Sequence, residues 1–557
     1  MSRPWLTSYP EGVPAEADTD AYDSLLDVFE DCCSRFAERT SFSNYGCAIS
    51  YRQLDEYSKQ LAAFLQQELG LSAGNKVAIM MPNLIQNPVS IFGVLRAGLT
   101  VVNVNPLYTA EELQHQINDA DVDTIIVLEN FAATLEKVVA NTGIKNVIVT
   151  RMGDMFGFPK SMLFNAVVKH VKKMVPNYSL KGHIPFRQAL QQGSDHSYQR
   201  PGLQQHDIAF LQYTGGTTGV AKGAILTHGN LVANLQQVTA WFTPVEIGDD
   251  EKIITALPLY HIFSLTANCL FYMTMGAENL LITNPRDMKD FVKQIRNARF
   301  SAITGVNTLF NGLLNTPGFA DVDFSRLRIA LGGGMAVQKS VAERWKHVTG
   351  TPLIEAYGLT ETSPAACINP LDITDYTGKI GLPLPSTECC VKDENGEMVA
   401  AGVAGELCLR GPQVTQGYYN RAEETRQVFD DDGWFHTGDI AMIDEDGYVQ
   451  IVDRKKDMIV VSGFNVYPNE VEDVIAGHPA VREVGVIGLP HDDSGEEVVA
   501  VVVSDDPQLS LEQLRQHCEQ HLTRYKLPRR LILTEEVPKT NVGKILRRKL
   551  REQYLDN

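Results

Sequence analysis

A stretch rich in glycine and threonine, "YTGGTTGVAKG" from Tyr213 to Gly223, contains one lysine, Lys222, and lies between a strand-like run and a helical pattern. Backbone N–H groups in a glycine-rich turn can converge on an anion, and threonine hydroxyls add donors or bind a metal. The lysine would supply positive charge to phosphate oxygens. A glycine-rich surface turn is the alternative, but glycines, hydroxyls and one cation together favour phosphate binding.

This stretch differs from the loop of P-loop kinases and GTPases. That loop requires the pattern G-x-x-x-x-G-K-[ST], whereas Ala221 precedes Lys222 and Gly223 follows it. A second stretch, "VGKI" at Val542–Ile545, has isoleucine where the hydroxyl that holds magnesium would be needed. We therefore exclude a P-loop enzyme.

The elements that must position this loop alternate between strands and helices. Apolar runs at Lys76–Met81 and Thr100–Asn105 flank an amphipathic run at Val89–Ala97. Strand, helix and strand at this spacing predict parallel βαβ units and an α/β core. From Ile380 onward, short strands separated by Gly, Pro and Asp turns predict a smaller β-rich subdomain.

After Arg454 the sequence predicts a separate unit. It contains a helix that we expect to open at Asn469, a buried strand "VVAVVV" and a second helix "LEQLRQHCEQHL". The charged stretch "DRKKD" lies at the boundary, where a linker or hinge belongs. The expected fold class is α/β: a large N-terminal domain with two α/β subdomains and a β-rich subdomain, followed by a small mobile α+β C-terminal domain.

Composition restricts the classes of partner and compartment. The net charge is −19, which disfavours binding to nucleic acid, because phosphate backbones attract basic surfaces. Nine cysteines form no CxxC pair, so the sequence indicates neither a disulfide framework nor a zinc site. The longest uncharged apolar stretch, Ile262–Ala277, is shorter than the roughly 20 residues that cross a bilayer. We expect a cytoplasmic protein without a membrane-spanning segment.

Several motifs recur in one order along nearly the whole chain. Besides the Tyr213 stretch they are "LPLYHIF" (Leu257–Phe263), "ALGGGMAV" (Ala330–Val337), "EAYGLTET" (Glu355–Thr362), "GWFHTGD" (Gly433–Asp439), "DRKKDMIVVSGFNVYPNEVE" (Asp453–Glu472) and "PKTNVGKILRR" (Pro538–Arg548). This set resembles the adenylate-forming superfamily of acyl-CoA synthetases, adenylation domains and luciferases. It is most similar to bacterial long-chain fatty-acid CoA ligases.

The resemblance implies a domain organisation and a reaction. It implies an N-terminal AMP-binding domain at 1–453, with its β-rich subdomain at about 380–453, a hinge at 454–457 and a C-terminal catalytic lid at 458–557. In the implied reaction a fatty carboxylate attacks the α-phosphorus of ATP, and the thiol of coenzyme A then displaces AMP. The implied co-substrates are fatty acid, ATP and coenzyme A, with Mg²⁺ as the metal.

Catalytic roles follow from the resemblance. Lys544 would bridge the fatty carboxylate and the α-phosphate, Lys222 would act on the phosphates, and Lys456 would be the hinge residue. Glu361 would hold Mg²⁺ with the hydroxyl of Thr214, since carboxylate and hydroxyl oxygens are hard ligands. On spacing alone Lys544 begins a basic run typical of a solvated helix face, and Glu361 is an acid favoured near a helix start.

Further nucleotide and coenzyme A contacts are implied in the same way. Asp439 would chelate the ribose hydroxyls, and Tyr357 would stack on the adenine. His261 either lies near the carboxylate tunnel or has a structural role, and both interpretations stand. The complete set of implied binding residues is Tyr213, Thr214, Gly215, Gly216, Thr217, Thr218, Gly219, Lys222, Gly333, Gly334, Glu355, Ala356, Tyr357, Gly358, Thr360, Asp439, Arg454, Lys456, Gly463, Asn465 and Lys544.

Two features bear on lipid. Ile262–Ala277 and Ile303–Leu314 are candidate walls of an acyl tunnel, and core packing explains either run equally well. Between Met155 and Lys181 an amphipathic pattern puts an apolar stripe opposite lysines. Such a helix either rests at an anionic membrane surface or packs on its own domain.

Rival functions stay open on the sequence. The chain could be a ligase for another carboxylate, or an acyl-AMP ligase that serves a carrier protein. From a different class, it could be a nucleotide- or lipid-binding sensor that lost the chemistry, although Lys222, Glu361, Asp439, Lys456 and Lys544 together argue against that. A homodimer and the preferred acyl length are also left open.

Overall fold

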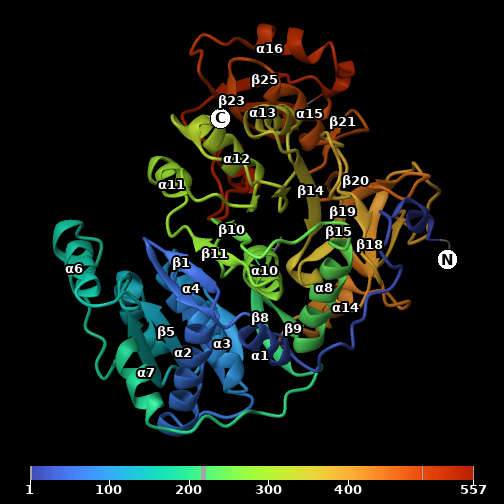
Figure 1. Ribbon diagram of the computed structural model, residues 1–557. Coiled ribbons are helices and arrows are strands. Elements are labelled where there is room, and N and C mark those ends of the chain that lie inside the picture. The colour runs from blue at the N-terminus through green and yellow to red at the C-terminus, as the bar shows by residue number, and fades with distance from the viewer. Residues whose placement is uncertain (1–2, 215–220, 492, 556–557) are drawn as a thin grey trace.

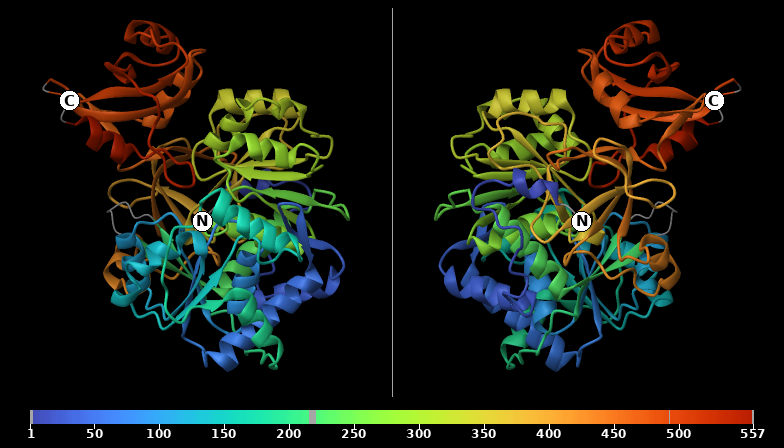
Figure 2. Two further views of the ribbon diagram at one scale, coloured as in Figure 1. Left: turned by 90° about the vertical axis from the view of Figure 1, so that its left-hand side faces the viewer. Right: turned by 90° about the vertical axis from the view of Figure 1, so that its right-hand side faces the viewer.

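The computed structural model describes residues 3–214, 221–491 and 493–555. A large N-terminal body carries a smaller C-terminal unit above one end of it (Figure 1). Side views show that this unit lies over an edge of the body and is joined to it through the β-rich region (Figure 2). The fold-class prediction is confirmed: mixed α/β sheets build a large domain that is followed by a small one.

The first sheet of the body contains the glycine-rich segment at one edge. Its strand order is β7-β6-β5-β3-β4-β8-β9, parallel except for the antiparallel β8–β9 pair. The strands are β3 (Lys76–Met80), β4 (Thr100–Asn103), β5 (Thr124–Leu128), β6 (Asn146–Thr150), β7 (Ile184–Pro185), β8 (Ile208–Thr214) and β9 (Lys222–Thr227). The predicted βαβ unit is present as β3, α3 (Gln86–Arg96) and β4.

The second sheet provides the floor of the site. Its order is β16-β15-β14-β13-β12-β10-β11-β1-β2, with parallel pairing from β14 to β1 and antiparallel strands at both ends. The strands are β1 (Thr40–Asn44), β2 (Cys47–Ser50), β10 (Lys252–Thr255), β11 (Glu278–Leu281), β12 (Ala302–Gly305), β13 (Ile329–Gly332), β14 (Leu353–Gly358), β15 (Ala365–Ile368) and β16 (Leu382–Pro383).

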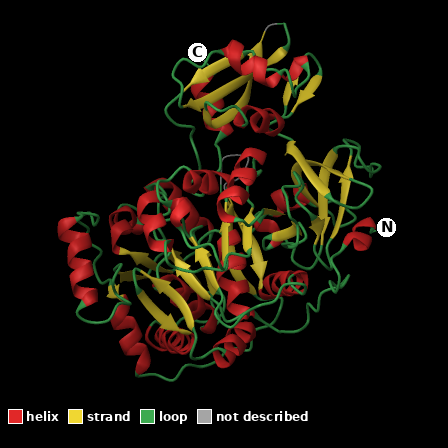
Figure 3. Ribbon diagram, turned by 45° about the horizontal axis from the view of Figure 1, so that its top comes forward, coloured by secondary structure: helices red, strands yellow, loops and turns green. Residues whose placement is uncertain are grey.

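Helices cover both sheets (Figure 3). They include α1 (Leu25–Arg35), α2 (Tyr51–Ala63), α4 (Ala110–Asp119), α5 (Ala132–Glu136), α7 (Phe186–Ser194), α8 (His228–Trp241), α9 (Ile262–Ser264), α10 (Phe271–Thr274), α11 (Met288–Ile295), α12 (Asn307–Leu314), α13 (Lys339–Thr349) and α14 (Ala422–Val428). Capping boxes fix several starts, as where the Thr227 hydroxyl accepts the N–H of Asn230 at 3.1 Å. The prediction of an amphipathic helix at α3 is wrong, because every residue of α3 is buried between α1, α2 and the sheet.

The amphipathic stretch at 155–181 forms a shorter helix than its pattern predicts. α6 spans Lys160–Ala166 and continues into a short π-helix at Val167–Val171. The predicted apolar stripe is largely exposed rather than packed, with Leu163 58% and Val171 70% accessible. α6 projects from the N-terminal body beside β1 and forms the left margin of Figure 1.

The β-rich region is an antiparallel sheet of order β17-β18-β19-β20. Its strands are β17 (Glu388–Lys392), β18 (Gly405–Arg410), β19 (Phe435–Ile443) and β20 (Val449–Arg454). The start of the chain is tied to this sheet: Trp5 is buried, and a Cβ at Gly447 would come within 2.4 Å of its backbone. Arg3 pairs with Glu388 at 3.0 Å.

The C-terminal unit has its own core around β21 (Ile459–Val461), β22 (Phe464–Val466), β23 (Val481–His491), β24 (Gly495–Ser504) and β25 (Arg530–Leu533), packed with α15 (Pro468–Ala476), α16 (Leu511–Cys518) and α17 (Arg547–Tyr554). The predicted start of its first helix at Asn469 is wrong. α15 begins at Pro468 with Tyr467 as N-cap, because proline suits the first helical turn.

Over the ranges that the structure describes, none of the helices is both long and apolar enough to cross a bilayer.

Candidate active site

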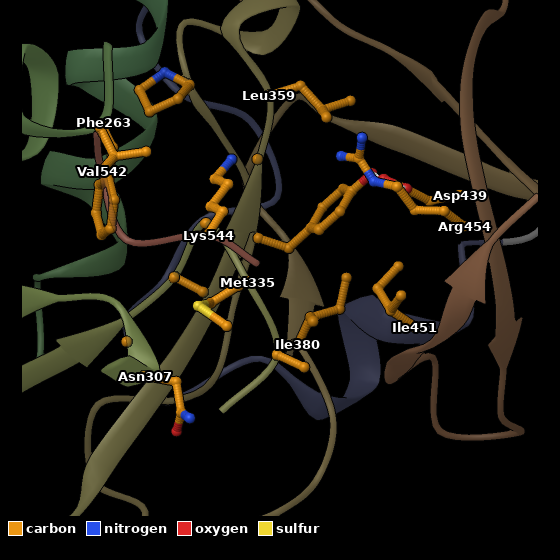
Figure 4. A pocket seen from close by; sticks show the side chains of 18 of the residues that line it. Phe263, Asn307, Met335, Leu359, Ile380, Asp439, Ile451, Arg454, Val542 and Lys544 are labelled. Carbon is orange, nitrogen blue, oxygen red and sulfur yellow. Dashed lines mark hydrogen bonds and ion pairs between the residues drawn. The ribbon is translucent and has the colours of Figure 1, made fainter. Parts of the chain in front are cut away.

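A deep cleft of about 1480 Å³ lies between the body and the C-terminal unit. The ends of β8, β13, β14, β19 and β20 contribute to its lining, as does the loop that carries Lys544. Figure 4 shows Lys544 extended into the cleft, with Phe263 on one side and Arg454 and Asp439 on the other. Residues from distant motifs therefore meet in one space.

The described part of the glycine-rich segment is held by strand pairing. Thr214, the last residue of β8, pairs with Lys222, the first residue of β9. The Tyr213 hydroxyl donates to Oδ2 of Asp119 at 2.7 Å, which anchors its ring on α4. Lys222 lines the cleft, with Nζ 5.5 Å from the ring centre of Tyr418. The predicted contacts Gly215, Gly216, Thr217, Thr218 and Gly219 lie outside the described residues.

Glycines open the floor of the cleft at the end of β13. A Cβ at Gly333 would lie 3.0 Å from the carbonyl oxygen of Ala356 and 3.2 Å from the Phe263 ring. Gly334 has φ of +76°, a conformation that favours glycine. Next to them on β14, Glu355, Ala356, Tyr357 and Gly358 line the cleft. At Gly333 and Gly334 the backbone itself therefore lines the cleft.

Asp439 is buried and held from two sides. Tyr357 donates its hydroxyl to Oδ2 at 2.6 Å, and Nε of Arg454 lies 3.1 Å from Oδ1. Asp439 in turn raises the pKa of Arg454. Each carboxylate oxygen has two lone pairs, so both can still accept from hydroxyl groups. The Asp439 carboxylate is thus fixed in place as an acceptor for a polyol such as ribose.

Glu361 lies in a 3₁₀ turn, Thr360–Thr362, that faces the cleft. Its Oε1 accepts the Tyr418 hydroxyl at 2.7 Å, and its backbone oxygen accepts the N–H of Thr415. In the described ranges, acidic, His and Cys side chains do not gather in threes as a metal cage would require. One carboxylate with a nearby hydroxyl fits Mg²⁺, which is usually held by one or two carboxylates together with substrate phosphates.

Lys544 is a buried cation next to the glycine floor. A Cβ at Gly334 would lie 3.5 Å from its Cε. Burial, followed by the positive charge of Arg454, lowers the pKa of Lys544 to about 8, although Asp439 and Glu361 oppose this shift. Burial penalises the charged amine more than these two carboxylates favour it, so an anionic ligand would raise the pKa of Lys544 again.

The position of His261 is compatible with both interpretations that the sequence leaves open, a structural role and a place in the lining of the cleft. It is the N-cap of α9, where its Nδ1 accepts the N–H of Phe263 at 3.3 Å, and it also lines the cleft. Burial and then the charge of Lys544 lower its pKa to about 3. A neutral imidazole that accepts at Nδ1 carries its proton on Nε2 and can donate from there.

Contacts between the body and the C-terminal unit hold Lys544 in place. The Thr308 hydroxyl on α12 donates to the carbonyl of Gly543 at 3.0 Å, and Asn311 donates to the carbonyl of Arg482 at 3.1 Å. On α13 the N–H of Lys339 donates to Asp473 at 3.0 Å. The arrangement is therefore closed over the cleft.

The residues around the linker fall into two groups. Lys456 lines the cleft, and burial lowers its pKa. Gly463 and Asn465 lie on the exposed β21–β22 hairpin, and the described residues that line the cleft do not include them. Gly463 has φ of +82° with open space around it. The structure thus unites most of the predicted nucleotide contacts but leaves these two apart.

Sequence reasoning missed the residues that support the site. Tyr418 contacts Glu361 and Lys222, and Asp119 anchors Tyr213. Arg547, in the basic run after Lys544, is buried among acidic side chains. Its spacing of three residues from Lys544 was the one available signal, and the run's charge alone suggested a solvated face.

Buried apolar side chains of the body form one part of the cleft lining, which is called the apolar branch below. The first candidate wall contributes Phe263, Ala267, Phe271 and Tyr272 to it, whereas the second presents only the polar side chains of Thr304, Asn307, Thr308 and Asn311 to the cleft. Val238 and Phe242 on α8 and Ile329 and Leu331 on β13 complete the branch. Its side chains favour a long apolar group over a charged one.

Comparison with known sequences places the chain in a family. A profile of AMP-binding enzymes matches residues 29–419, and a profile of the AMP-binding enzyme C-terminal domain matches residues 470–544. The chain belongs to the AMP-binding enzyme family, which confirms the resemblance. Long-chain-fatty-acid–CoA ligase of Salmonella typhimurium is 54% identical over 99% of this chain and 98% of that protein. The Haemophilus influenzae protein of the same name is 50% identical over 100% and 99%.

Solved structures agree with this assignment. ATP-bound MatB from Rhodopseudomonas palustris is 28% identical, with a TM-score of 0.81 over 95% of this chain and 99% of that one. The anthranilate CoA ligase AuaEII, solved with anthranoyl-AMP, has a TM-score of 0.84 at 24% identity over 96% and 97% of the two chains. At that identity the second likeness establishes the fold alone.

Proposed function

We propose that this protein is an AMP-forming ligase that joins a long-chain fatty acid to coenzyme A through an acyl-adenylate. One observation carries the proposal: the apolar branch and the charged side chains of Lys544, Glu361 and Asp439 line the same cleft. The apolar branch suits an alkyl chain, and the polar part of the cleft suits a nucleoside triphosphate. Relatives at 50% and 54% identity bear the name long-chain-fatty-acid–CoA ligase.

In the first half-reaction a carboxylate must approach a polyanion, so the site must supply fixed positive charge. Lys544 would bridge the carboxylate and the α-phosphate, while Lys222 and Thr360 contact phosphate oxygens. Asp439 would hold the ribose, and the glycine floor with Tyr357 would hold the adenine. Glu361 and Thr214 would bind Mg²⁺, which neutralises phosphate charge when bound.

In the second half-reaction the thiol of coenzyme A displaces AMP, and Lys544 is no longer required. We place the pivot for the change of arrangement at Lys456, between β20 and β21. Rotation there would bring the hairpin with Gly463 and Asn465 to the cleft, where coenzyme A could pass close to the backbone. Lys456→Pro should trap one arrangement, because proline fixes φ. A variant with both half-reactions at parental rates would contradict this pivot.

The test is thioester formation with ATP, Mg²⁺ and coenzyme A across a series of carboxylates. Each buried methylene contributes about 0.8 kcal/mol, so kcat/KM should rise about fourfold per carbon until the branch is filled. An aryl acid that outperforms every alkyl acid would assign a different substrate. Acyl-adenylate that accumulates without thioester would indicate an acyl-AMP ligase, and the absence of AMP release with every acid would indicate a sensor.

We also propose that the surface of α6 and its flanks rests on an anionic membrane. Phe158, Met162, Leu163, Val167, Val171 and Met174 are exposed there, between 44% and 83%. Lys169, Lys172 and Lys173 are exposed on the same segment. Each lysine near an anionic surface contributes about 1 kcal/mol, and buried apolar side chains add to this. Fatty acid dissolved in the membrane would then be close to the enzyme.

Vesicle sedimentation tests this surface. The protein should bind vesicles that contain phosphatidylglycerol, and Leu163→Gln with Val171→Gln should weaken that binding at least tenfold while thioester formation from dispersed short acids is unchanged. Ile247→Gln is the matched control, because Ile247 is an exposed apolar side chain elsewhere, at 46%. Equal binding by all variants would dismiss the membrane surface.

A further inference from the structure

Arg547 is a buried cation surrounded by acidic groups. Its side chain is only 14% exposed and contacts three carboxylates: Asp453 at 3.4 Å, Asp457 at 3.3 Å and Glu472 at 2.7 Å. It also donates to Oδ1 of Asn469 at 2.5 Å. Contacts with three carboxylates and one amide oxygen hold the guanidinium group of Arg547 in a fixed position.

The partners of Arg547 lie on two sides of the linker. Asp457, Asn469 and Glu472 follow Lys456 and belong with Arg547 to the C-terminal unit. Asp453 precedes Lys456, in β20 of the body, and its side chain is completely buried. It also accepts the N–H of Asn469 at 2.8 Å. Asp453 therefore joins the C-terminal unit to the body through two contacts that cross the linker.

Rotation about Lys456 has unequal effects on this cluster. Arg547 would keep Glu472 and Asp457, which move with it, so its charge would stay balanced. Asp453 would lose its cation and the N–H of Asn469, and would keep the N–H of Arg454, which donates to its Oδ1 at 2.7 Å. Because a buried carboxylate without a cation is costly, the closed arrangement gains from the contact while Arg547 itself does not depend on it.

The backbone connects this cluster to the active site. Arg547 begins α17, three residues after Lys544. The intervening loop is held by its own bonds, since the N–H of Thr540 donates to the carbonyl of Lys544 at 2.7 Å and the N–H of Leu546 donates to the carbonyl of Pro538 at 2.9 Å. A fixed Arg547 thus fixes the direction in which Lys544 enters the cleft.

We propose that Asp453 and Arg547 form a latch that holds the C-terminal unit in the arrangement which places Lys544 in the cleft. Both are positioning residues that favour adenylation and must separate for thioester formation. The latch rests on the proposed function for its role in the two half-reactions. Its structural part, the closing of the unit over Lys544, can be tested without catalysis.

Asp453→Asn and Glu472→Gln make a matched pair, because each removes one carboxylate from the same guanidinium on opposite sides of the linker. Asp453→Asn should lower ATP–pyrophosphate exchange at least about tenfold, as expected when a charge-assisted contact no longer favours the closed arrangement. Thioester formation from preformed acyl-adenylate should stay within about twofold. Glu472→Gln should change both half-reactions in the same proportion.

The second readout is the reactivity of Lys544 with acetic anhydride in the enzyme without substrates, followed by mass spectrometry. Asp453→Asn should increase acetylation of Lys544 relative to the exposed Lys172, and Glu472→Gln should not. Parental reactivity in Asp453→Asn would overturn the latch even if the enzyme acts on no fatty acid. If instead the proposed function is wrong, the parent protein will show no ATP–pyrophosphate exchange. The difference in Lys544 acetylation between the parent and Asp453→Asn will nevertheless remain.

Arg547→Lys tests the other half of the latch and guards against loss of folding. Lysine keeps the buried charge but cannot reach three carboxylates at once, so the variant should fold and show the same uneven loss as Asp453→Asn. Thermal unfolding checks the fold of each variant. An equal decline of both half-reactions in folded Asp453→Asn and Arg547→Lys would overturn the proposal.

Discussion

Two basic segments, residues 155–181 around α6 on the body and α17 on the C-terminal unit, have similar sequence patterns and different surroundings. The segment around α6 exposes both its lysines and its apolar stripe, with Leu163 58% accessible. In α17 the apolar Leu550 is buried and Arg547 points into an acidic cluster. The difference comes from segments distant in sequence, because Asp453 and Glu472 supply the carboxylates that α6 lacks. A basic amphipathic sequence pattern therefore does not predict whether the apolar and basic side chains of a helix are buried or exposed.

The largest effect should come from the loop that leads into α17. Lys544→Ala should lower ATP–pyrophosphate exchange by roughly 10² to 10³, the usual cost of removing one charge-stabilising donor. Thioester formation from preformed acyl-adenylate should fall much less. Equal losses in the two assays would refute the assignment of Lys544 to the first half-reaction. Lys172→Ala, in the exposed segment that follows α6, is the control and should leave both rates unchanged.

The apolar residues of the two helices should differ in how much they contribute to the free energy of unfolding. Leu550 is 1% exposed, so Leu550→Ala should lower the free energy of unfolding by about 2 to 5 kcal/mol. The same change at Leu163 should stay within about 0.5 kcal/mol, since surface substitutions rarely cost more. Denaturant unfolding of both variants measures this. A large loss at Leu163 would mean that the α6 stripe is packed in solution.

The charge of Lys544 should depend on nucleotide. Burial lowers its pKa to about 8, so keeping the amine charged costs free energy below pH 8, and that cost disappears as the pH rises from 8 towards 10.5. At pH 9 the amine is mostly neutral, and bound phosphates should restore its proton. Calorimetry in buffers of different ionisation enthalpy should show proton uptake on ATP binding at pH 9 and little at pH 7. Lys544→Arg should abolish the difference.

The smallest effect on stability and activity is expected at Arg548, the neighbour of Arg547 in α17. Arg548 is 70% exposed and pairs with Glu552 one turn on, so Arg548→Ala should change stability by less than about 0.5 kcal/mol. Both half-reactions should keep parental rates. A loss comparable with that of Arg547 variants would show that general basicity of the helix matters, rather than the position of one guanidinium.

The sequence was sufficient for the fold class and for many residues of the cleft, because ordered motifs place Asp439, Tyr357 and Lys544 without knowledge of the geometry. It could not show what supports them. The contacts of Tyr418 with Glu361 and of Asp119 with Tyr213 join residues 57 and 94 positions apart, and no local pattern encodes such pairs. The burial of α3 on all sides and the exposure of the α6 stripe depend likewise on neighbours that periodicity does not reveal.

The segment Pro4–Ser8 meets partners that are synthesised much later than itself. Ser8 donates to the carbonyl of Asp446, and Trp5 packs against Gly447, so some 438 residues separate the two halves of this contact. During translation Trp5 and Ser8 stay without these partners until the β19–β20 turn has left the ribosome. The sheet that carries Asp439 is therefore completed by a segment made long before it.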